Sequence, residues 1–291
     1  MSEAENLQGT QLSFIGCGVM AEAIIAGLLN NHLVKPEQIV GSHPRSERRE
    51  ELERKYGIRL VENNTEAVRS AQSPVNSSAS EVSSSIIFLT VKPQRLGMIL
   101  SQLRGTLRKA QLVVSIVAGA RIETLIKDLM HESIVRAMPN TPAQVGEGMT
   151  VWTATPAVTE AQQTQIRTIL GALGRELHVE EEKMIDMATA LSATGPTYTF
   201  LMMEALIDAG VHLGFSRHVA QELVLQTMLG SIIFARESLK HPAELRNMVT
   251  SPGGTSAEAI YQMEKGSLRT VLSKAVWAAY QRTIALGKKT D

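Results

Sequence analysis

Several features are scarce in this sequence of 291 residues, and each scarcity excludes or disfavours a class of protein or of binding site. Cys17 is the single cysteine, so no disulfide can form within the chain and a zinc site built from several thiolates is excluded. The 29 basic and 29 acidic side chains cancel, which leaves no basic surplus of the kind that nucleic-acid-binding proteins usually carry.

Long hydrophobic runs are also missing. No segment approaches the ~20 apolar residues that a membrane-spanning helix needs, and the polar, acidic start MSEAENLQGTQ does not resemble a secretory signal. His212, His218 and His241 lack the spacing of metal ligands, so we expect no metal. We expect a cytoplasmic protein with neither a membrane nor a nucleic acid as its partner.

The first part of the chain alternates apolar, strand-like runs with helical ones. This pattern is typical of βαβ units and predicts an α/β Rossmann-type domain with a mainly parallel sheet covered on both faces. The predicted helices cover residues 20–31, 46–57, 121–130 and about 159–173. The predicted strands cover residues 11–16, 38–42, 84–91, 111–119, 133–140, 148–154 and 175–180.

The strand pattern stops near residue 180, which predicts a boundary between a domain of residues 1–180 and a helical domain of residues 181–291. Helices are expected over residues 182–193, 196–214, 216–240 and 267–289, with Ser216 and Ser267 as N-caps. Apolar residues nearly encircle two of these segments, so we expect a partner subunit to bury part of them. They are Met202, Met203, Leu206, Leu223, Leu225, Met228, Leu229, Ile232, Ile233 and Phe234.

A serine-rich stretch, residues 72–85, is the one low-complexity segment and predicts a surface loop. It is interpreted either as a tolerated insertion or as a regulatory phosphorylation site.

A glycine motif marks the first strand–helix turn. Gly16-x-Gly18-x-x-Ala21 stands where a dinucleotide-binding turn needs a tight bend, close access for a pyrophosphate, and close packing of helix on strand. The alternative is a tight turn that binds nothing. Because further βα units follow, the motif predicts a dinucleotide cofactor.

The end of the second strand indicates which dinucleotide is bound. An NAD site places an acid there for the ribose 2′-hydroxyl, whereas this strand ends in Ser42 and is followed by Arg45. A hydroxyl and a guanidinium suit a 2′-phosphate, so NADPH is predicted, with NADH as the alternative. Arg48 and Arg49 are interpreted as the solvated face of a charged helix.

Polar groups follow two further strands. Lys92 and Pro93 come after one, and Asn140 and Thr141 after another, where the carboxyl edge of the sheet should border the nicotinamide. Either proline motif also suits an ordinary loop. In the helical half, TSPGGTS, residues 250–256, precedes a helix and bares N–H and hydroxyl groups, as an anion site would.

Together, FIGCGVMAEAI, VKPQ, MPNTP, SATGPTY and VTSPGGTS resemble the pyrroline-5-carboxylate reductase family, in order and spacing, over about residues 11–285. The resemblance implies an oxidoreductase that makes L-proline, the last step of proline biosynthesis, by reducing a cyclic imine with NAD(P)H. It also implies a Rossmann domain, a helical domain that interlocks two subunits, and a homodimer that assembles into a decamer.

The resemblance assigns site residues. On the cofactor side they are Gly16, Gly18, Val19, Met20, Ser42, Asn64, Val91, Lys92, Pro93, Ala118 and Asn140, to which the arginine argument adds Arg45. On the substrate side Ser251, Gly253, Gly254, Thr255 and Ser256 form the loop that binds the carboxylate. The family's last loop residue is a threonine whose hydroxyl reaches the ring nitrogen; here it is Ser256, which keeps the hydroxyl, with Thr255 as the other candidate.

Two alternatives accompany this hypothesis. One is a reductase of a related, larger cyclic imine or of a 2-keto acid. The other is an NADP-sensing or scaffold protein without turnover. Ketone reduction needs a positioned acid, and the helical half offers no compact His/Asp or Lys/Asn set for it.

Overall fold

The computed structural model describes residues 7–71 and 84–288. The chain forms two compact units, one of residues up to Thr194 together with the chain from Ala279 onward, the other of Gly195–Ala278. Most of the serine-rich stretch, residues 72–83, lies outside the described residues.

The first unit is built on an eight-stranded sheet within the described residues, with strand order β3-β2-β1-β4-β5-β6-β7-β8. Neighbouring strands run parallel except for the antiparallel pair β6–β7. The strands are β1 (Thr10–Ile15), β2 (Ile39–Ser42), β3 (Arg59–Val61), β4 (Ser84–Leu89), β5 (Leu112–Ser115), β6 (Ile134–Met138), β7 (Gly148–Ala154) and β8 (Gly174–His178). The predicted mainly parallel α/β fold is confirmed.

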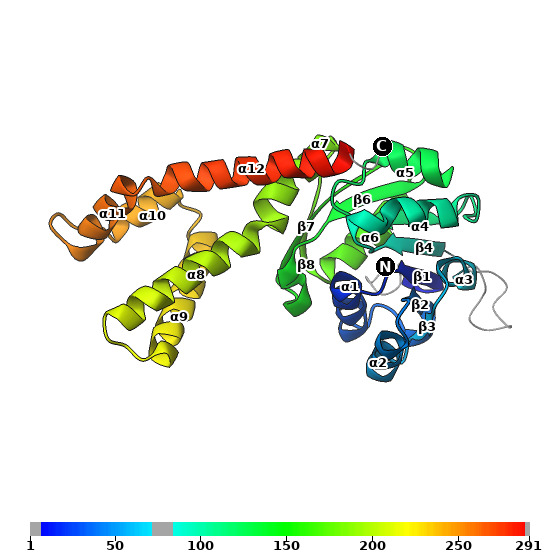
Figure 1. Ribbon diagram of the computed structural model, residues 1–291, viewed down its shortest axis with the longest axis horizontal. Helices are drawn as coiled ribbons and strands as arrows, with labels where there is room; N and C mark the ends of the chain where they lie inside the picture. Colours follow the sequence, from blue (N-terminus) through cyan, green and yellow to red (C-terminus); the bar gives the residue numbers. More distant parts are fainter. Residues whose placement is uncertain (1–6, 72–83, 289–291) are drawn as a thin grey trace. The chain divides into compact units, whose positions relative to one another are not determined.

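Helices cover both faces of this sheet (Figure 1). They are α1 (Val19–Asn30), α2 (Ser46–Tyr56), α3 (Asn64–Ser70), α4 (Leu96–Leu103), α5 (Ile122–Leu129), α6 (Glu160–Gly171) and α7 (Lys183–Ala188). Shorter turns are η2 (Pro36–Gln38), η3 (Pro93–Arg95), η4 (Thr141–Val145) and the π-helical η5 (Thr189–Ala193). The helix predicted over residues 182–193 is thus α7 followed by a π-turn.

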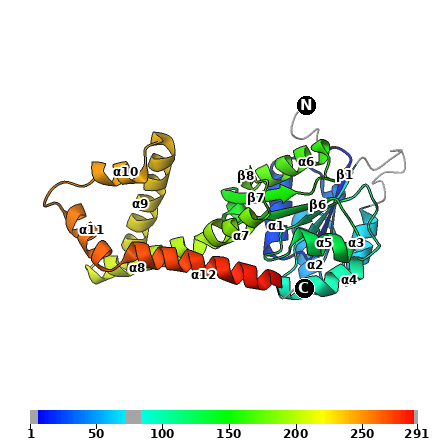
Figure 2. The same ribbon diagram turned by 90° about the horizontal axis from the view of Figure 1, so that it is seen from above.

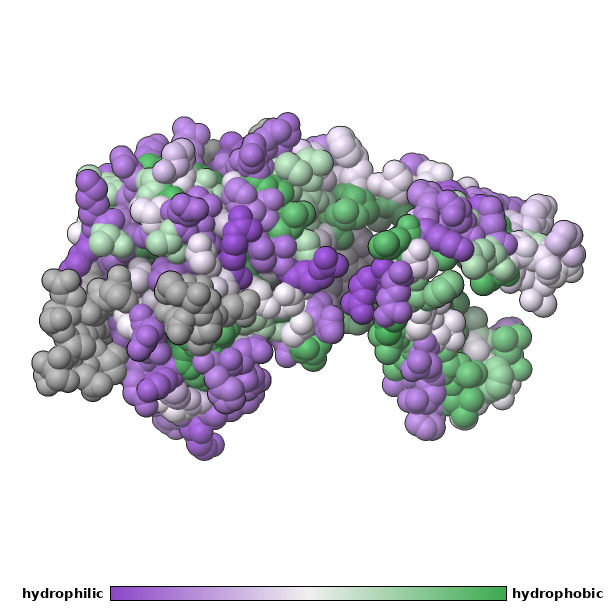
Figure 3. Space-filling view, turned by 180° about the vertical axis from the view of Figure 1, so that it is seen from behind, coloured by the Kyte–Doolittle hydropathy of each residue, from purple (hydrophilic) through white to green (hydrophobic). Residues whose placement is uncertain are grey.

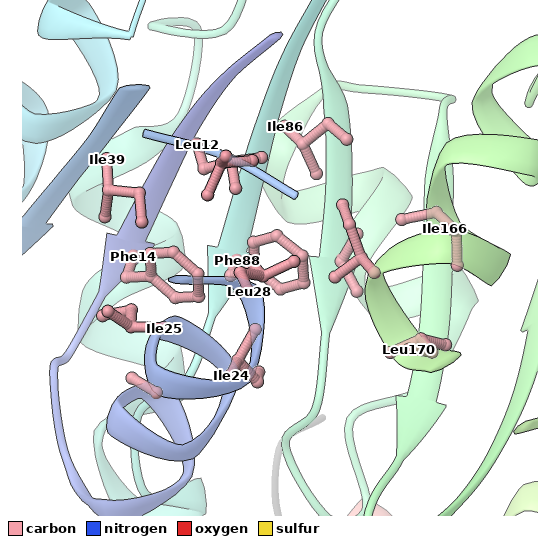
Figure 4. Close-up of a cluster of buried hydrophobic side chains, with 14 of the residues drawn as sticks. Leu12, Phe14, Ile24, Ile25, Leu28, Ile39, Ile86, Phe88, Ile166 and Leu170 are labelled. Atoms are coloured by element: carbon pink, nitrogen blue, oxygen red, sulfur yellow. The ribbon is translucent and has the colours of Figure 1, made fainter. Parts of the chain in front are cut away.

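Alternation along the central strands creates two cores. Phe14 of β1 and Phe88 of β4 point to one face, where their rings stack 4.8 Å apart beneath α1 and α6 (Figure 4). Ile15 and Ile87 point to the other face, onto α3, α4 and α5. Because both faces are buried, the strands are almost continuously apolar, and their carboxyl ends are left free to form a site.

The second unit is helical. Its elements are α8 (Gly195–His212), α9 (Arg217–Ser238), α10 (Pro242–Met248), α11 (Thr255–Lys265) and the first part of α12 (Leu268–Lys288), all drawn in Figure 2; from Ala279 onward α12 belongs to the first unit. Ser216 caps α9 as predicted, accepting from the N–H of Val219 at 3.3 Å. A Cβ on Gly210 would lie 2.9 Å from Cβ of Ala220, so α8 and α9 pack closely there.

The α8–α9 pair exposes much of its hydrophobic surface (Figure 3). Phe200, Leu206, Leu229, Ile232 and Phe234 are each more than half exposed, between 51% and 59%. Apolar area of this kind commonly marks an interaction surface.

Candidate functional site

The glycine turn lies at the carboxyl end of β1, against the neighbouring strands. The N–H groups of Gly16 and Cys17 donate to the carbonyl of Ser42 at 3.2 and 2.9 Å, which ties the turn to the end of β2. Thr90, after β4, donates its hydroxyl to the carbonyls of Ile15 and Gly16, both at 2.9 Å. Gly16 has φ +93° and a Cβ there would lie 2.6 Å from Cγ1 of Val91, so this position requires glycine.

Gly18 has the opposite surroundings. It is the N-cap of α1, no side chain of the described residues caps this helix, and the nearest heavy atom to a Cβ on Gly18 is 4.0 Å away. The first N–H groups of a helix lack intrahelical partners and favour an anion. Ala21 is fully buried, so the helix approaches the strand closely. The turn therefore fits the pyrophosphate of a dinucleotide.

Cys17 lies within this turn but is not a reactive thiol. It is fully buried, and burial raises the pKa of its thiol to about 12. A protonated, inaccessible thiol is a poor nucleophile.

Ser42 and Asn64 form a buried support behind the turn. The Ser42 hydroxyl, fully buried, donates to Oδ1 of Asn64 at 2.7 Å and accepts from the N–H of Gly16 at 3.3 Å. Asn64 in turn donates from Nδ2 to Gln102 at 2.8 Å. The two predicted adenosine-side residues are thus brought together, and their side chains hold the turn in place.

The three arginines after β2 differ in whether their guanidinium groups bond other groups of the protein. Arg48 donates to the carbonyl of Cys17 at 3.4 Å, and pairs with Glu22 and, at 2.9 Å, with Glu51. Arg49 donates to the carbonyls of His43 and Pro44 at 2.8 and 3.0 Å. Both are largely buried and internally paired, so their interpretation as a solvated face is wrong.

Arg45 differs from these two. It is exposed, and its guanidinium makes no hydrogen bond or ion pair within the described residues. It therefore remains available to a ligand.

Glu22 on α1 is the acid at the centre of a hydrogen-bond network with α2. This region beside the glycine turn and the end of β2 is called the β2 corner below. Burial alone would raise its pKa, but hydrogen bonds from Lys55, Arg48 and Tyr56 lower the pKa of Glu22 to about 2. The network fastens α2 to α1 beside the glycine turn.

The remaining predicted cofactor residues follow β4, β5 and β6 at the same edge of the sheet. Val91 lies against Gly16, and the exposed Lys92 is the N-cap of η3, which begins at Pro93. Ala118 follows β5 and packs among Met138 and Val151.

Asn140, after β6, is fully engaged. Its Oδ1 accepts from the N–H of Met149 at 2.9 Å, and its Nδ2 donates to the carbonyl and hydroxyl oxygens of Ser192, each at 3.4 Å. Ser192 belongs to η5, and the N–H of Thr194, the residue after η5, donates to the carbonyl of Thr189 at 2.9 Å. Asn140 thus joins the loop after β6 to a π-helical turn, a feature often found at functional sites.

A buried ion cluster beneath this loop was missed by the sequence analysis. Arg136 of β6, 1% exposed, pairs with Glu182 at 2.7 Å and Asp186 at 2.5 Å. Glu182 also accepts the N–H of Ile122 at 2.8 Å. A lone Arg in an apolar strand was the available signal, because such a charge requires partners.

In the second unit, Ser251–Gly254 forms the loop before α11. Gly253 has φ +71°, Gly254 donates to the carbonyl of Ser251 at 3.0 Å, and a Cβ on Gly254 would lie 2.5 Å from Oγ of Ser251. The hydroxyls of Ser251, Thr255 and Ser256 have no partners within the described residues, and no described side chain caps α11. The five predicted substrate residues thus lie together in the loop and in the first turn of α11, at a helix N-terminus of the kind that favours an anion.

None of the described helices is long and apolar enough to cross a membrane. No group of three or more His, Cys, Asp or Glu side chains in the described part of the chain could hold a metal ion.

Two family models match the chain. Residues 182–286 match the pyrroline-5-carboxylate reductase dimerisation model. Residues 11–119 match the model described as NADP oxidoreductase, coenzyme F420-dependent.

Similar proteins cover nearly the whole chain. Pyrroline-5-carboxylate reductase from Synechocystis sp. is 41% identical over 279 residues, 96% of this chain and 99% of the relative. The Pisum sativum enzyme of that name is 36% identical, covering 94% of each chain. The crystal structure of Plasmodium falciparum pyrroline carboxylate reductase with NADP bound has a TM-score of 0.83 at 31% identity, covering 95% of this chain and 98% of that one.

Proposed function

This chain belongs to the pyrroline-5-carboxylate reductase family and reduces 1-pyrroline-5-carboxylate to L-proline with a nicotinamide cofactor; for it we propose the residue roles, cofactor preference and assembly that follow. The main support for the cofactor site is the open space beside Gly18, at the start of α1, which no described side chain caps.

Bound NADPH supplies the hydride that the imine carbon accepts. The N–H groups of Val19 and Met20, in the first turn of α1, hold the pyrophosphate, while Thr90 and Ser42 keep Gly16 in place. Val91, Lys92, Pro93 and Ala118 line the route toward the nicotinamide, at the carboxyl ends of β4 and β5, and Asn140 orients the loop after β6.

The loop before α11 binds the substrate's carboxylate. The free N–H groups at the start of the helix and the hydroxyl of Ser251 are the donors, and Gly253 and Gly254 let the backbone approach without a Cβ. Hydrogen-bond donors stabilise an anion most when they are held in position before it binds. The hydrogen bond from the N–H of Gly254 to the carbonyl of Ser251 holds this loop in position.

The Ser256 hydroxyl is proposed to contact the ring nitrogen. A cyclic imine can be protonated before hydride transfer, so the reaction needs orientation and one hydrogen-bonding group near nitrogen, without a strong general acid. Ser256 is the second residue of α11, and its hydroxyl is free of internal bonds within the described residues. Thr255 is the alternative at the neighbouring position.

The partner is proposed to be a second copy of the chain. The exposed apolar surface of α8 and α9 and the match to a dimerisation model support a homodimer, with a decamer as the further assembly. A single buried cysteine supports a reducing, cytoplasmic setting.

One assay tests the function directly. Oxidation of NADPH should follow addition of 1-pyrroline-5-carboxylate, and should be slower with the six-membered cyclic imine, with a 2-keto acid, and with NADH. A higher kcat/KM on either alternative substrate would reassign the substrate. Cofactor binding with no turnover on any of the three would leave an NADP-sensing role.

A further inference from the structure

His43 occupies a distinctive position at the adenosine end of the proposed cofactor site. It directly follows β2 and pairs with the end of β3, where its N–H donates to the carbonyl of Val61 at 3.0 Å. Its ring Nδ1 accepts from the N–H of Arg45 at 3.3 Å. A ring that accepts at Nδ1 carries its proton at Nε2 when it is neutral, and Nε2 has no partner within the described residues.

Positive charge surrounds this imidazole. Burial is the main cause that lowers the pKa of His43 below its usual value; the hydrogen bond with the Arg45 backbone opposes it, and the charges of Arg45, Arg48 and Arg49 add to it. Of the nearby acids, Glu22 and Glu51 pair with Arg48, and Glu62, just after β3, is 3.7 Å from Arg49. Glu47, in the first turn of α2, is exposed to solvent. The β2 corner therefore holds a neutral imidazole beside a free guanidinium, that of Arg45.

The expected hydroxyl contact is not available at the β2 corner. Ser42 is fully buried, and its hydroxyl bonds Asn64 and the N–H of Gly16. Arg48 and Arg49 are likewise committed to other groups. His43 and Arg45, next to β2, thus remain able to contact a dianion added to the ribose.

We propose that His43, together with Arg45, recognises the 2′-phosphate of NADP(H), and that binding of this cofactor is coupled to uptake of a proton at His43. A dianion placed beside the ring favours the imidazolium, which can donate from Nε2 while the Arg45 N–H turns to a phosphate oxygen. The inference rests on the proposed preference for NADPH, and it adds a pH-dependent specificity that NADH does not share.

The direction of the pH dependence follows from the linkage between proton binding and cofactor binding. His43 has a lower pKa in the free protein than in the complex, so NADP(H) binding is tightest at low pH and weakens as pH rises through the pKa of the complex. The 2′-phosphate has its own second pKa near ~6, so it is mostly dianionic at pH 6.5 and almost completely so at pH 7.5 and 8.5. Each unit by which the pKa of His43 is higher in the complex than in the free protein corresponds to about a tenfold change in affinity for NADP(H).

Calorimetric titration with NADP+ and NAD+ at pH 6.5, 7.5 and 8.5 tests this coupling. For the wild type, the Kd of NADP+ should rise about tenfold across the series, while that of NAD+ changes less than about twofold. In His43→Gln the Kd of NADP+ should be flat, about tenfold weaker than wild type at pH 6.5 and equal to it at pH 8.5. His32→Asn, an exposed histidine after α1, is the matched control and should behave as wild type.

A second measurement requires no variant. Titration of the wild type at pH 7.5 in two buffers of different ionisation enthalpy should show proton uptake with NADP+ and none with NAD+. Equal uptake for both cofactors, or a His43→Gln variant weakened by the same factor at every pH, would overturn the proposal. If NADP+ binds no more tightly than NAD+ at any pH, the proposed cofactor preference fails instead.

Discussion

Gly16, at the end of β1, lies directly against Val91, which follows β4: a Cβ on Gly16 would be 2.6 Å from Cγ1 of Val91 and 3.3 Å from its Cα. The second contact is with backbone, so it cannot be relieved by a side-chain rotation. Two predicted cofactor residues, 75 positions apart in sequence number, therefore determine each other's positions.

The two glycines of the turn should respond differently to alanine. Gly16→Ala adds both the Val91 clash and strain at φ +93°, so it should lower the free energy of unfolding by about 1–3 kcal/mol. Gly18→Ala has room for its Cβ and φ −85°, so its thermal unfolding should match wild type while the Kd of NADPH rises about tenfold or more. Wild-type affinity in Gly18→Ala would place the pyrophosphate elsewhere.

The Glu22 network should make stability depend on pH. The pKa of Glu22 is lowered to about 2 in the folded protein, so its contribution is complete well above its ordinary value of 4.5 and is lost as pH falls toward 2. Glu22→Gln should therefore cost about 1–3 kcal/mol of unfolding free energy at pH 7, and the difference from wild type should shrink below pH 4.5. Urea unfolding at pH 7, 4.5 and 3.5 measures it.

Glu51→Gln is the matched control. Glu51 also pairs with Arg48 but is 56% exposed, and exposed pairs contribute at most about 1 kcal/mol. An equal loss in both variants, constant with pH, would argue against a special role for Glu22.

Much of the fold was predictable because its signals are local. The strand–helix alternation, the glycine turn and the Ser216 cap each depend on a few consecutive residues. β3 was missed because three residues, Arg59–Val61, are too few to show a periodic pattern.

The site was harder to predict because its contacts are tertiary. Serine at the end of β2 suggested contact with the ribose, but whether its hydroxyl faces a ligand or Asn64 depends on α3, which the pattern did not reveal. The π-turn at η5 likewise depends on Asn140, which reaches Ser192 from 52 positions away. No residue pattern within residues 182–193 specifies that contact.

The Arg136 cluster should be important for stability. Arg136→Met would leave the carboxylates of Glu182 and Asp186 facing each other without their cation, and should cost about 2–4 kcal/mol of unfolding free energy. Arg136→Lys keeps the charge but cannot bond both acids in the same fork, so its loss should be intermediate. Chemical denaturation of the three proteins gives the order, and a Lys variant as unstable as the Met variant would show that geometry outweighs charge.

The exposed face of α9 should govern assembly. Leu225, Leu229 and Ile232 lie at helical spacing, and the last two are 54% and 59% exposed. The double variant Leu229→Glu, Ile232→Glu should lower the mass measured by light scattering from that of a dimer or larger assembly toward that of a monomer, because two charges cannot be buried there unpaired. Gln226→Glu, an exposed polar residue of the same helix, is the control. An unchanged mass in the double variant would move the interface to another surface.

Ser256 provides the sharpest test of the chemistry. Ser256→Ala removes the proposed hydrogen bond to a partly charged nitrogen, worth ~1.5–3 kcal/mol, so kcat/KM should fall roughly ten- to 150-fold. Ser256→Thr keeps the hydroxyl and fixes its rotamer, so it should retain or raise activity. Thr255→Ala should lose less, and Ser231→Ala, whose hydroxyl bonds Thr227 within α9, should be neutral.

The pattern among these four variants decides which hydroxyl acts. Hydride addition converts the iminium nitrogen into an amine with a lone pair, to which the Ser256 hydroxyl can donate. Because this bond strengthens during hydride transfer, the loss in Ser256→Ala should appear in kcat as well as in kcat/KM. A loss confined to KM would make Ser256 a carboxylate ligand like Ser251. Wild-type kinetics in Ser256→Ala together with a large loss in Thr255→Ala would transfer the role to Thr255, the first residue of the same helix.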